Sequence, residues 1–134
     1  MKLISFKRIV LGEFTANQFS IFEHKRLFSI IIYYFKGNGW QDRFHTHAFN
    51  AISIKVFGNY SERILTEKKT ETYHQVIRSR VFKYFPKSTY HMLGKSSGCL
   101  TILFSGPWDS TWKEFKGGEE FELTWGRKKS IVLD

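Results

Sequence analysis

The sequence predicts an all-β chain that folds as a jelly roll or small closed barrel, and three observations support this fold class. Short runs rich in Val, Ile, Thr, Tyr and Phe recur every eight to twelve residues or so, with turn residues between them. Aromatic residues make up 18% of the 134 positions, and 14 of them are phenylalanine, a composition typical of strands. No long amphipathic helical pattern interrupts these runs.

The first strands are expected in the first half of the chain. The run 27–35 (LFSIIIYYF) is followed by Gly-Asn-Gly at 37–39, where a reversal is expected because these residues adopt positive φ angles readily. The run 43–57 ends at Gly-Asn at 58–59, which predicts a hairpin turn into a strand over 60–65.

Alternation within the second run predicts a barrel wall with two different faces. A kink is expected near Ala48, and beyond it successive residues point to opposite sides of the strand. One face carries Ile52, Ile54 and Val56, and the other carries Ala51, Ser53 and Lys55.

The second half continues in the same way. A polar loop over 66–70 precedes two strands that end at Pro86, a loop over 94–98 separates two further strands, and the segment 109–115 fits either a helical turn or a strand. The strands expected here are 71–79, 80–85, 90–93, 99–105 and 121–125.

The chain is expected to form a single domain over 1–134, since no repeat or linker divides it. Cys99 is the only cysteine, so an intramolecular disulfide is impossible, and its apolar surroundings predict a buried thiol in a reducing cytoplasm. Neither a signal-peptide core nor an apolar stretch long enough to cross a bilayer is present, so no membrane partner is expected.

The net charge of +9, from 21 Lys and Arg against 12 Asp and Glu, favours an anionic partner. A small anionic ligand is preferred over nucleic acid, because the basic residues fall into short, separate clusters that are typical of solvated turns. These clusters are Lys25-Arg26, Lys68-Lys69, Arg78 with Arg80, and Arg127 to Lys129.

Three histidines form a candidate metal site. His45 and His47 are two residues apart in RFHTHAFN, so in a strand their rings stand on one face at a spacing that one metal ion can bridge. Zinc and iron accept imidazole nitrogen at about 2.1 Å and need at least one further ligand. His91, in FPKSTYHML after a proline-led turn, is the expected third ligand.

The residues around the first pair follow the order of a known motif. Gly39 is followed by five residues (WQDRF), then His45 and His47, and a glycine appears at Gly58. This resembles the first motif of the cupin superfamily, in which Gly, five residues and H-x-H are followed by three or four residues, Glu, six residues and Gly.

The third histidine lies in a second matching pattern. Pro86 and His91 stand where the second cupin motif has its proline and histidine, while Ser88 occupies the position of the glycine between them. The resemblance covers about residues 35–110 and implies a cupin barrel. It also extends to small cupin-like proteins of phage and bacterial genomes, through the late Gly106-Pro107 pair followed by Trp112.

The resemblance implies that His45, His47 and His91 are three of the usual four metal ligands, for Fe, Zn, Mn or Ni. The glutamate expected near Ala51 is missing, and Asn50 replaces it only if a bulge reorients the strand. A three-histidine site is therefore preferred.

Other polar and aromatic residues were weighed against this site. Glu62 is the best available carboxylate for proton transfer or ligation and is the candidate catalytic residue, and Tyr60 and Tyr84 share strands that can line the barrel. His24 and His74 fit ordinary polar roles, Tyr90 is expected to face away from the site, and Trp108 and Trp112 are expected to close one barrel end.

Two functions follow from such a site. The first is a metal-dependent enzyme, an oxygenase, isomerase or hydrolase, acting on a small anionic molecule. The second is a metal-containing binding protein that sequesters a nucleotide or another anion without turnover. With either function, the cupin resemblance further implies a homodimer formed through edge strands.

Overall fold

The computed structural model describes residues 2–11, 14–24, 26–41, 43–124 and 127–131. Within these ranges the regular structure consists of β-strands, and no helix has the length and hydropathy needed to cross a bilayer. The all-β prediction is therefore confirmed. The strands are β1 (Lys2–Leu11), β2 (Phe14–Glu23), β3 (Ser29–Trp40), β4 (Phe44–His45), β5 (Ala51–Glu67), β6 (Thr72–Ile77), β7 (Phe82–Phe85), β8 (His91–Ser105), β9 (Thr111–Lys116), β10 (Glu119–Thr124) and β11 (Arg127–Ile131).

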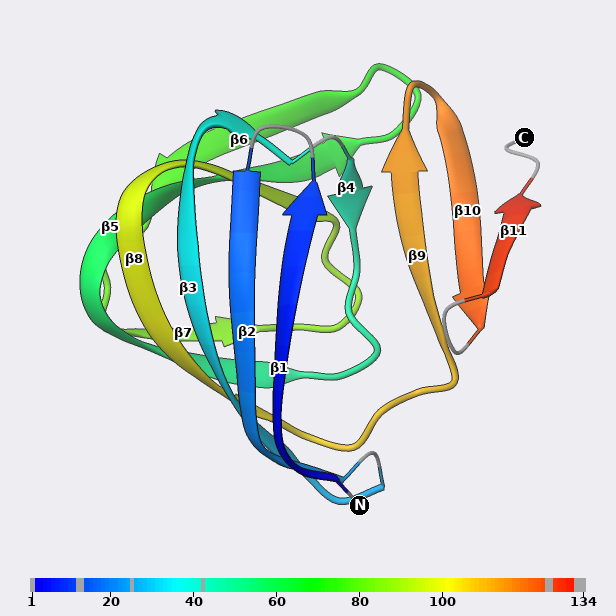
Figure 1. The fold of residues 1–134 in the computed structure, drawn as a ribbon. Helices are drawn as coiled ribbons and strands as arrows, with labels where there is room; N and C mark the ends of the chain where they lie inside the picture. The colour runs from blue at the N-terminus through cyan, green and yellow to red at the C-terminus, as the bar shows by residue number, and fades with distance from the viewer. Residues whose placement is uncertain (1, 12–13, 25, 42, 125–126, 132–134) are drawn as a thin grey trace.

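These strands form one antiparallel sheet in the order β1-β2-β3-β8-β4-β9-β10-β11, and β5 joins it through β8 while also pairing with β6 and β7. Figure 1 shows β3, β8 and β5 bending strongly, so that the sheet curves around an interior. The strand β8 is central to this arrangement, because it pairs with β3, β4 and β5.

The turns predicted at 37–39, 58–59 and 94–98 are wrong, because β3, β5 and β8 continue through them. The pairing shifts register near these glycines instead, between Phe35 and Gly37 on β3 and between Lys55 and Ser61 on β5. Glycine adopts the backbone conformation of a β-bulge as readily as that of a turn. Bulges bend a long strand, and here they produce the curvature of the barrel wall.

The N-terminal hairpin of β1 and β2 was not predicted, and it pairs with β3. Its buried residues are of mixed polarity, since both Phe14 and Ser20 are buried, so alternation of hydrophobicity is weak there. The segment 43–57 is interrupted between β4 and β5, and 109–115 contains a strand rather than a helical turn. Of the predicted strand 121–125, the last residue lies outside the described ranges.

The interior wall of β5 carries small or polar side chains, because Ala51 and Ser53 are buried while Ile52 and Val56 are about half exposed on the outside. The predicted division of this strand into two faces is therefore confirmed. Small side chains on the inner face leave room for a cavity, whose other walls come from clusters that include Phe35 and Leu103.

Candidate metal centre

The three histidines converge from two separate parts of the chain. His45 lies in β4 and is the direct cross-strand partner of His91, the first residue of β8. His47 lies beyond the end of β4, where its backbone N–H donates to the Lys87 carbonyl at 3.3 Å. The expectation that His45 and His47 share one strand is therefore wrong, yet one nitrogen from each histidine lies within 4.8 Å of the others.

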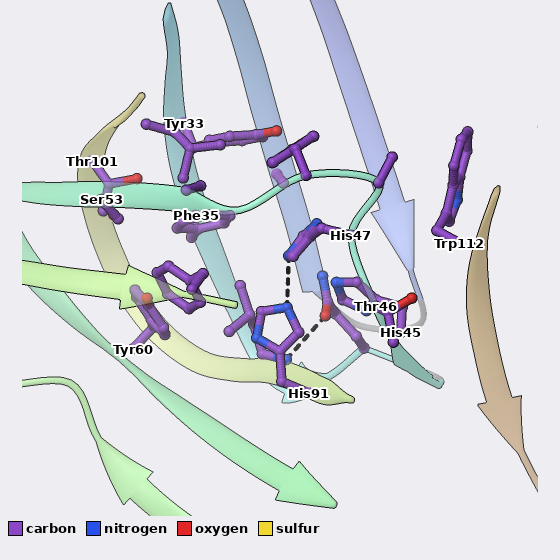
Figure 2. Close-up of a pocket in the computed structure, with 18 of the residues that line it drawn as sticks. Tyr33, Phe35, His45, Thr46, His47, Ser53, Tyr60, His91, Thr101 and Trp112 are labelled. Atoms are coloured by element: carbon purple, nitrogen blue, oxygen red, sulfur yellow. Dashed lines mark hydrogen bonds between the residues drawn. The ribbon is translucent and has the colours of Figure 1, made fainter. Parts of the chain in front are cut away.

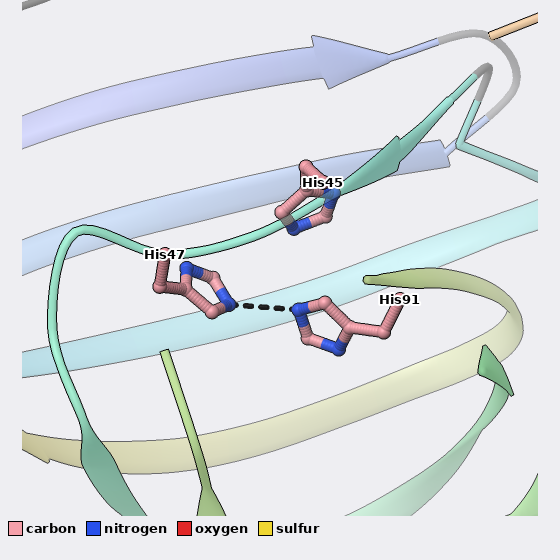
Figure 3. Close-up of side chains that lie close together, drawn as sticks. All are labelled: His45, His47 and His91. Atoms are coloured by element: carbon pink, nitrogen blue, oxygen red, sulfur yellow. Dashed lines mark hydrogen bonds between the residues drawn. The ribbon is translucent and has the colours of Figure 1, made fainter. Parts of the chain in front are cut away.

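The rings face one another, as Figure 3 shows. The Nε2 atoms of His47 and His91 are 2.7 Å apart, and the centroid of the His45 ring lies 5.1 Å from that of His47 and 4.6 Å from that of His91. Two imidazoles at this separation share a proton or direct their lone pairs toward a common cation.

The protonation state of the cluster fits a divalent metal. Burial, followed by the neighbouring His91, lowers the pKa of His45 to about 3, and the same causes hold the pKa of His47 well below its ordinary value. Both rings are therefore neutral at pH 7, the form that ligates metals. The Nδ1 atom of His45 is also buried and has no hydrogen-bond partner among the described residues. Zinc, iron and nickel suit a donor set of imidazole nitrogens.

Glu62 lies behind His91 rather than beside the other two histidines. Its Oε2 atom is 3.3 Å from His91 Nδ1, and its Oε1 atom accepts a hydrogen bond from Lys83 Nζ at 2.6 Å. Burial raises the pKa of the Glu62 carboxyl, but the bonds with His91 and Lys83 outweigh it and hold the pKa below the ordinary 4.5. A carboxylate in this position fixes the tautomer and orientation of a metal-binding imidazole.

A cavity of about 300 Å³ opens beside the histidines. Figure 2 shows Tyr60, Ser53 and Thr101 on one side of the histidines and Trp112 on the other. The walls of the cavity are mainly apolar, and none of its lining residues in the described part of the chain is Lys or Arg. The lining consists of Ala16, Tyr33, Phe35, Gln41, His45, Thr46, His47, Ala48, Phe49, Ala51, Ser53, Tyr60, Phe85, His91, Leu93, Thr101, Leu103, Trp108, Trp112 and Glu114.

Several residues weighed from the sequence lie elsewhere. The Asn50 Oδ1 atom accepts from the Lys87 backbone N–H, and Tyr90 hydrogen bonds with Glu120, so Tyr90 faces away from the cavity as predicted. Tyr84 is 58% exposed on the outer surface, so its predicted place inside the barrel is wrong. In the described part of the chain, His24 and His74 are not in the histidine cluster. The two tryptophans do line the cavity.

One carboxylate at the site was missed. Glu114 lines the cavity, is the cross-strand partner of His45, and accepts a hydrogen bond from Arg43 Nη1 at 2.7 Å. The segment TWKEFK alternates as a strand should, but sequence alone gives no indication that β9 pairs with β4. Gln41 and Thr101 were missed for the same reason, because each enters the cavity through tertiary pairing.

Three histidines gather at one cavity of a curved antiparallel barrel, and the predicted resemblance to cupins is confirmed at the level of the fold alone. The fold is similar to that of oxalate decarboxylase from Bacillus subtilis at pH 4.6, with 15% identity, a TM-score of 0.54, and coverage of 77% of this chain and 27% of that one.

A second structure of the same Bacillus subtilis enzyme, whose description names its Mn(II) centres, gives 14% identity and a TM-score of 0.53, with coverage of 77% and 28%. This chain therefore spans little more than a quarter of the length of the structures it matches. No protein-family model matches the sequence, and no curated protein matches it.

Proposed function

We propose that the protein is a metal-dependent enzyme in which His45, His47 and His91 hold one divalent cation and a small anionic substrate occupies the adjoining cavity. The convergence of three imidazole nitrogens within 4.8 Å carries this proposal. Replacing such a cluster by apolar side chains would favour folding, since buried polar groups cost free energy unless they are satisfied. Oxygenase, isomerase and hydrolase activities are all compatible with the site.

The chain's own residues hold and orient the cation. When bound, a divalent metal supplies Lewis acidity and lowers the pKa of coordinated water. His45 and His47 offer neutral nitrogens, and Glu62 keeps the proton of His91 on Nδ1 so that Nε2 is free to ligate. Glu62 thus acts through His91 as a positioning residue. Fe, Zn, Mn and Ni remain candidates, with manganese the first to test because similar structures are described with Mn(II).

Metal analysis of untagged protein purified without chelator tests the proposal. We expect about one equivalent of a divalent metal, lost in His45→Ala, His47→Ala and His91→Ala. His74→Ala is the matched control, because His74 is exposed on β6. Unchanged metal content in all three cluster variants contradicts the proposal.

A second candidate is a metal-containing binding protein without turnover. It is favoured by the scarcity of carboxylates at the cavity: among the lining residues that the structure describes, Glu114 is the one carboxylate, and it is engaged by Arg43. Stoichiometric ligand retention with no product, from protein with full metal content, would support this function over catalysis. For either function we propose a cytoplasmic location, supported by the single buried Cys99.

We also propose that the chain forms a homodimer. The outer apolar face comprises two cross-sheet rows on the outside of the barrel, Phe6-Phe19-Ile32-Ile102-Ile54-Phe82 and Ile30-Phe104-Ile52-Tyr84. Phe6 and Phe82 are each 65% exposed. At about 200 Å² per large side chain, the exposed members present on the order of 600 Å², close to the roughly 800 Å² that each partner buries in a stable interface.

A further inference from the structure

Arg78 is a buried arginine that lies behind two residues of the cavity wall, Ser53 and Tyr60. It is 3% exposed and follows the end of β6. Its guanidinium donates from Nη1 to Ser53 Oγ at 2.6 Å and to Tyr60 OH at 3.1 Å. It also donates from Nη2 to the carbonyls of Ser53 and Val81 and from Nε to the carbonyl of Arg80. The hydrogen-bonding groups of Arg78 are thus well satisfied.

Its charge is not. In the described ranges no carboxylate forms an ion pair with Arg78. A second cation, Lys55, approaches with its Nζ atom 3.5 Å from the Arg78 carbonyl and likewise has no ion pair there. A buried charge without a counterion is costly. An anion bound nearby would offset that cost.

The two residues whose hydroxyls accept from Arg78, Ser53 and Tyr60, both line the cavity. Because Ser53 Oγ and Tyr60 OH accept from the same guanidinium nitrogen, each keeps its own proton for donation to another group. Burial raises the pKa of Tyr60, so this phenol stays protonated. These two lining residues therefore offer hydroxyl donors polarised by a cation behind them, and Figure 2 shows Ser53 and Tyr60 on the side of the histidines away from Trp112.

We infer that Ser53 and Tyr60, backed by Arg78, form an oxyanion subsite that binds a carboxylate of the ligand. This subsite deepens the proposed function. It rests on that function only for the cation at the histidines, because the contacts of Arg78 are independent of the metal. Much of the remaining cavity wall is apolar, with Phe35, Phe85 and Leu103 among its residues. The ligand class is thus a small carboxylate with an apolar body, which fills a 300 Å³ cavity better than a compact dianion does.

Binding of phenylacetate and of phenylacetamide, measured by calorimetry on the protein as purified, tests the subsite. The two probes match in size and differ in charge. We expect phenylacetate to bind at least about tenfold more tightly, and Tyr60→Phe and Ser53→Ala each to reduce that preference about five- to tenfold. The controls are Tyr34→Phe and Ser61→Ala, which remove a hydroxyl from residues that do not line the cavity.

Two further readouts complete the test. Arg78→Met should abolish the preference, and in the wild type the side-chain N–H resonances of Arg78 should shift with phenylacetate and not with phenylacetamide. Metal content is measured on the same samples. Loss of the metal site is thereby detected separately from a change in the ratio of the two affinities. Equal affinities for the two probes, no binding at millimolar concentration, or an unchanged preference in Tyr60→Phe and Ser53→Ala would each overturn the subsite.

Discussion

The carboxylate of Glu62 and the imidazole of His91 form a buried pair, with Glu62 Oε2 3.3 Å from His91 Nδ1. The other nitrogen of the same ring, Nε2, lies 2.7 Å from His47 Nε2. His91 therefore connects a carboxylate on β5 to the histidine cluster. Because Lys83 Nζ also donates to Glu62, the carboxylate has a fixed position from which it orients the ring.

Replacement of Glu62 by glutamine should weaken metal binding without removing a ligand. The amide keeps the volume of the side chain but loses the charge that holds the His91 proton on Nδ1, and such changes typically cost ten- to a hundredfold in affinity. Titration with Co(II) or Mn(II) measures the effect. Glu67→Gln is the control, since Glu67 is exposed on the same strand. An unchanged dissociation constant in Glu62→Gln would argue against this positioning role.

The stability of the metal-free protein should fall as the pH drops below about 6.5. The pKa of His45 is about 3 in the folded chain, against the ordinary value of 6.5 that applies to the unfolded chain. Below pH 6.5 the unfolded state therefore binds a proton that the folded state does not. Each such histidine costs about 1.4 kcal/mol of stability per pH unit. Urea unfolding between pH 6.5 and 5 measures this slope above the range where carboxyl groups titrate.

A matched pair of variants isolates the contribution of the cluster. His45→Asn should reduce the slope by about 1.4 kcal/mol per pH unit, and His74→Asn, at an exposed position on β6, is the matched substitution outside the cluster. Identical slopes in wild type and His45→Asn would show that His45 titrates normally in the folded protein.

Gly58→Ala should destabilise the barrel. Gly58 has a φ of +80°, and a Cβ atom there would collide with the Gly98 carbonyl on the neighbouring strand. The strained backbone and the contact together should cost about 1–3 kcal/mol. Chemical unfolding measures the loss. Gly106→Ala is the control, because its nearest neighbour would be 3.6 Å away, and a loss of similar size there would refute this explanation.

A charge on the outer apolar face should dissociate the proposed homodimer. Phe82→Lys changes a side chain that is 65% exposed on β7, so the folded monomer should tolerate it while a paired copy would bury an unmatched charge. Sedimentation measures the mass in solution. His74→Lys, at an exposed position on β6 outside this face, should remain dimeric. A monomeric wild type would contradict the homodimer itself.

The sequence alone was sufficient to predict that the chain is built of β-strands and to identify the candidate metal ligands. The histidine spacings and their agreement with two cupin motifs depend on local order along the chain, and residue types alone indicate metal chemistry. Alternation over 51–57 likewise identified which residues share a face, because successive side chains of a strand point to opposite sides wherever that strand is placed.

Only the tertiary structure decided where those faces and residues go. Glycine fits a turn and a bulge equally well, so the continuity of β5 and β8 depended on their pairing with each other. The placement of Glu62 behind His91, of Glu114 opposite His45 and of Arg78 behind Ser53 follows from contacts between residues far apart in the chain. No local pattern specifies such contacts, because they arise only when the whole sheet closes around its interior.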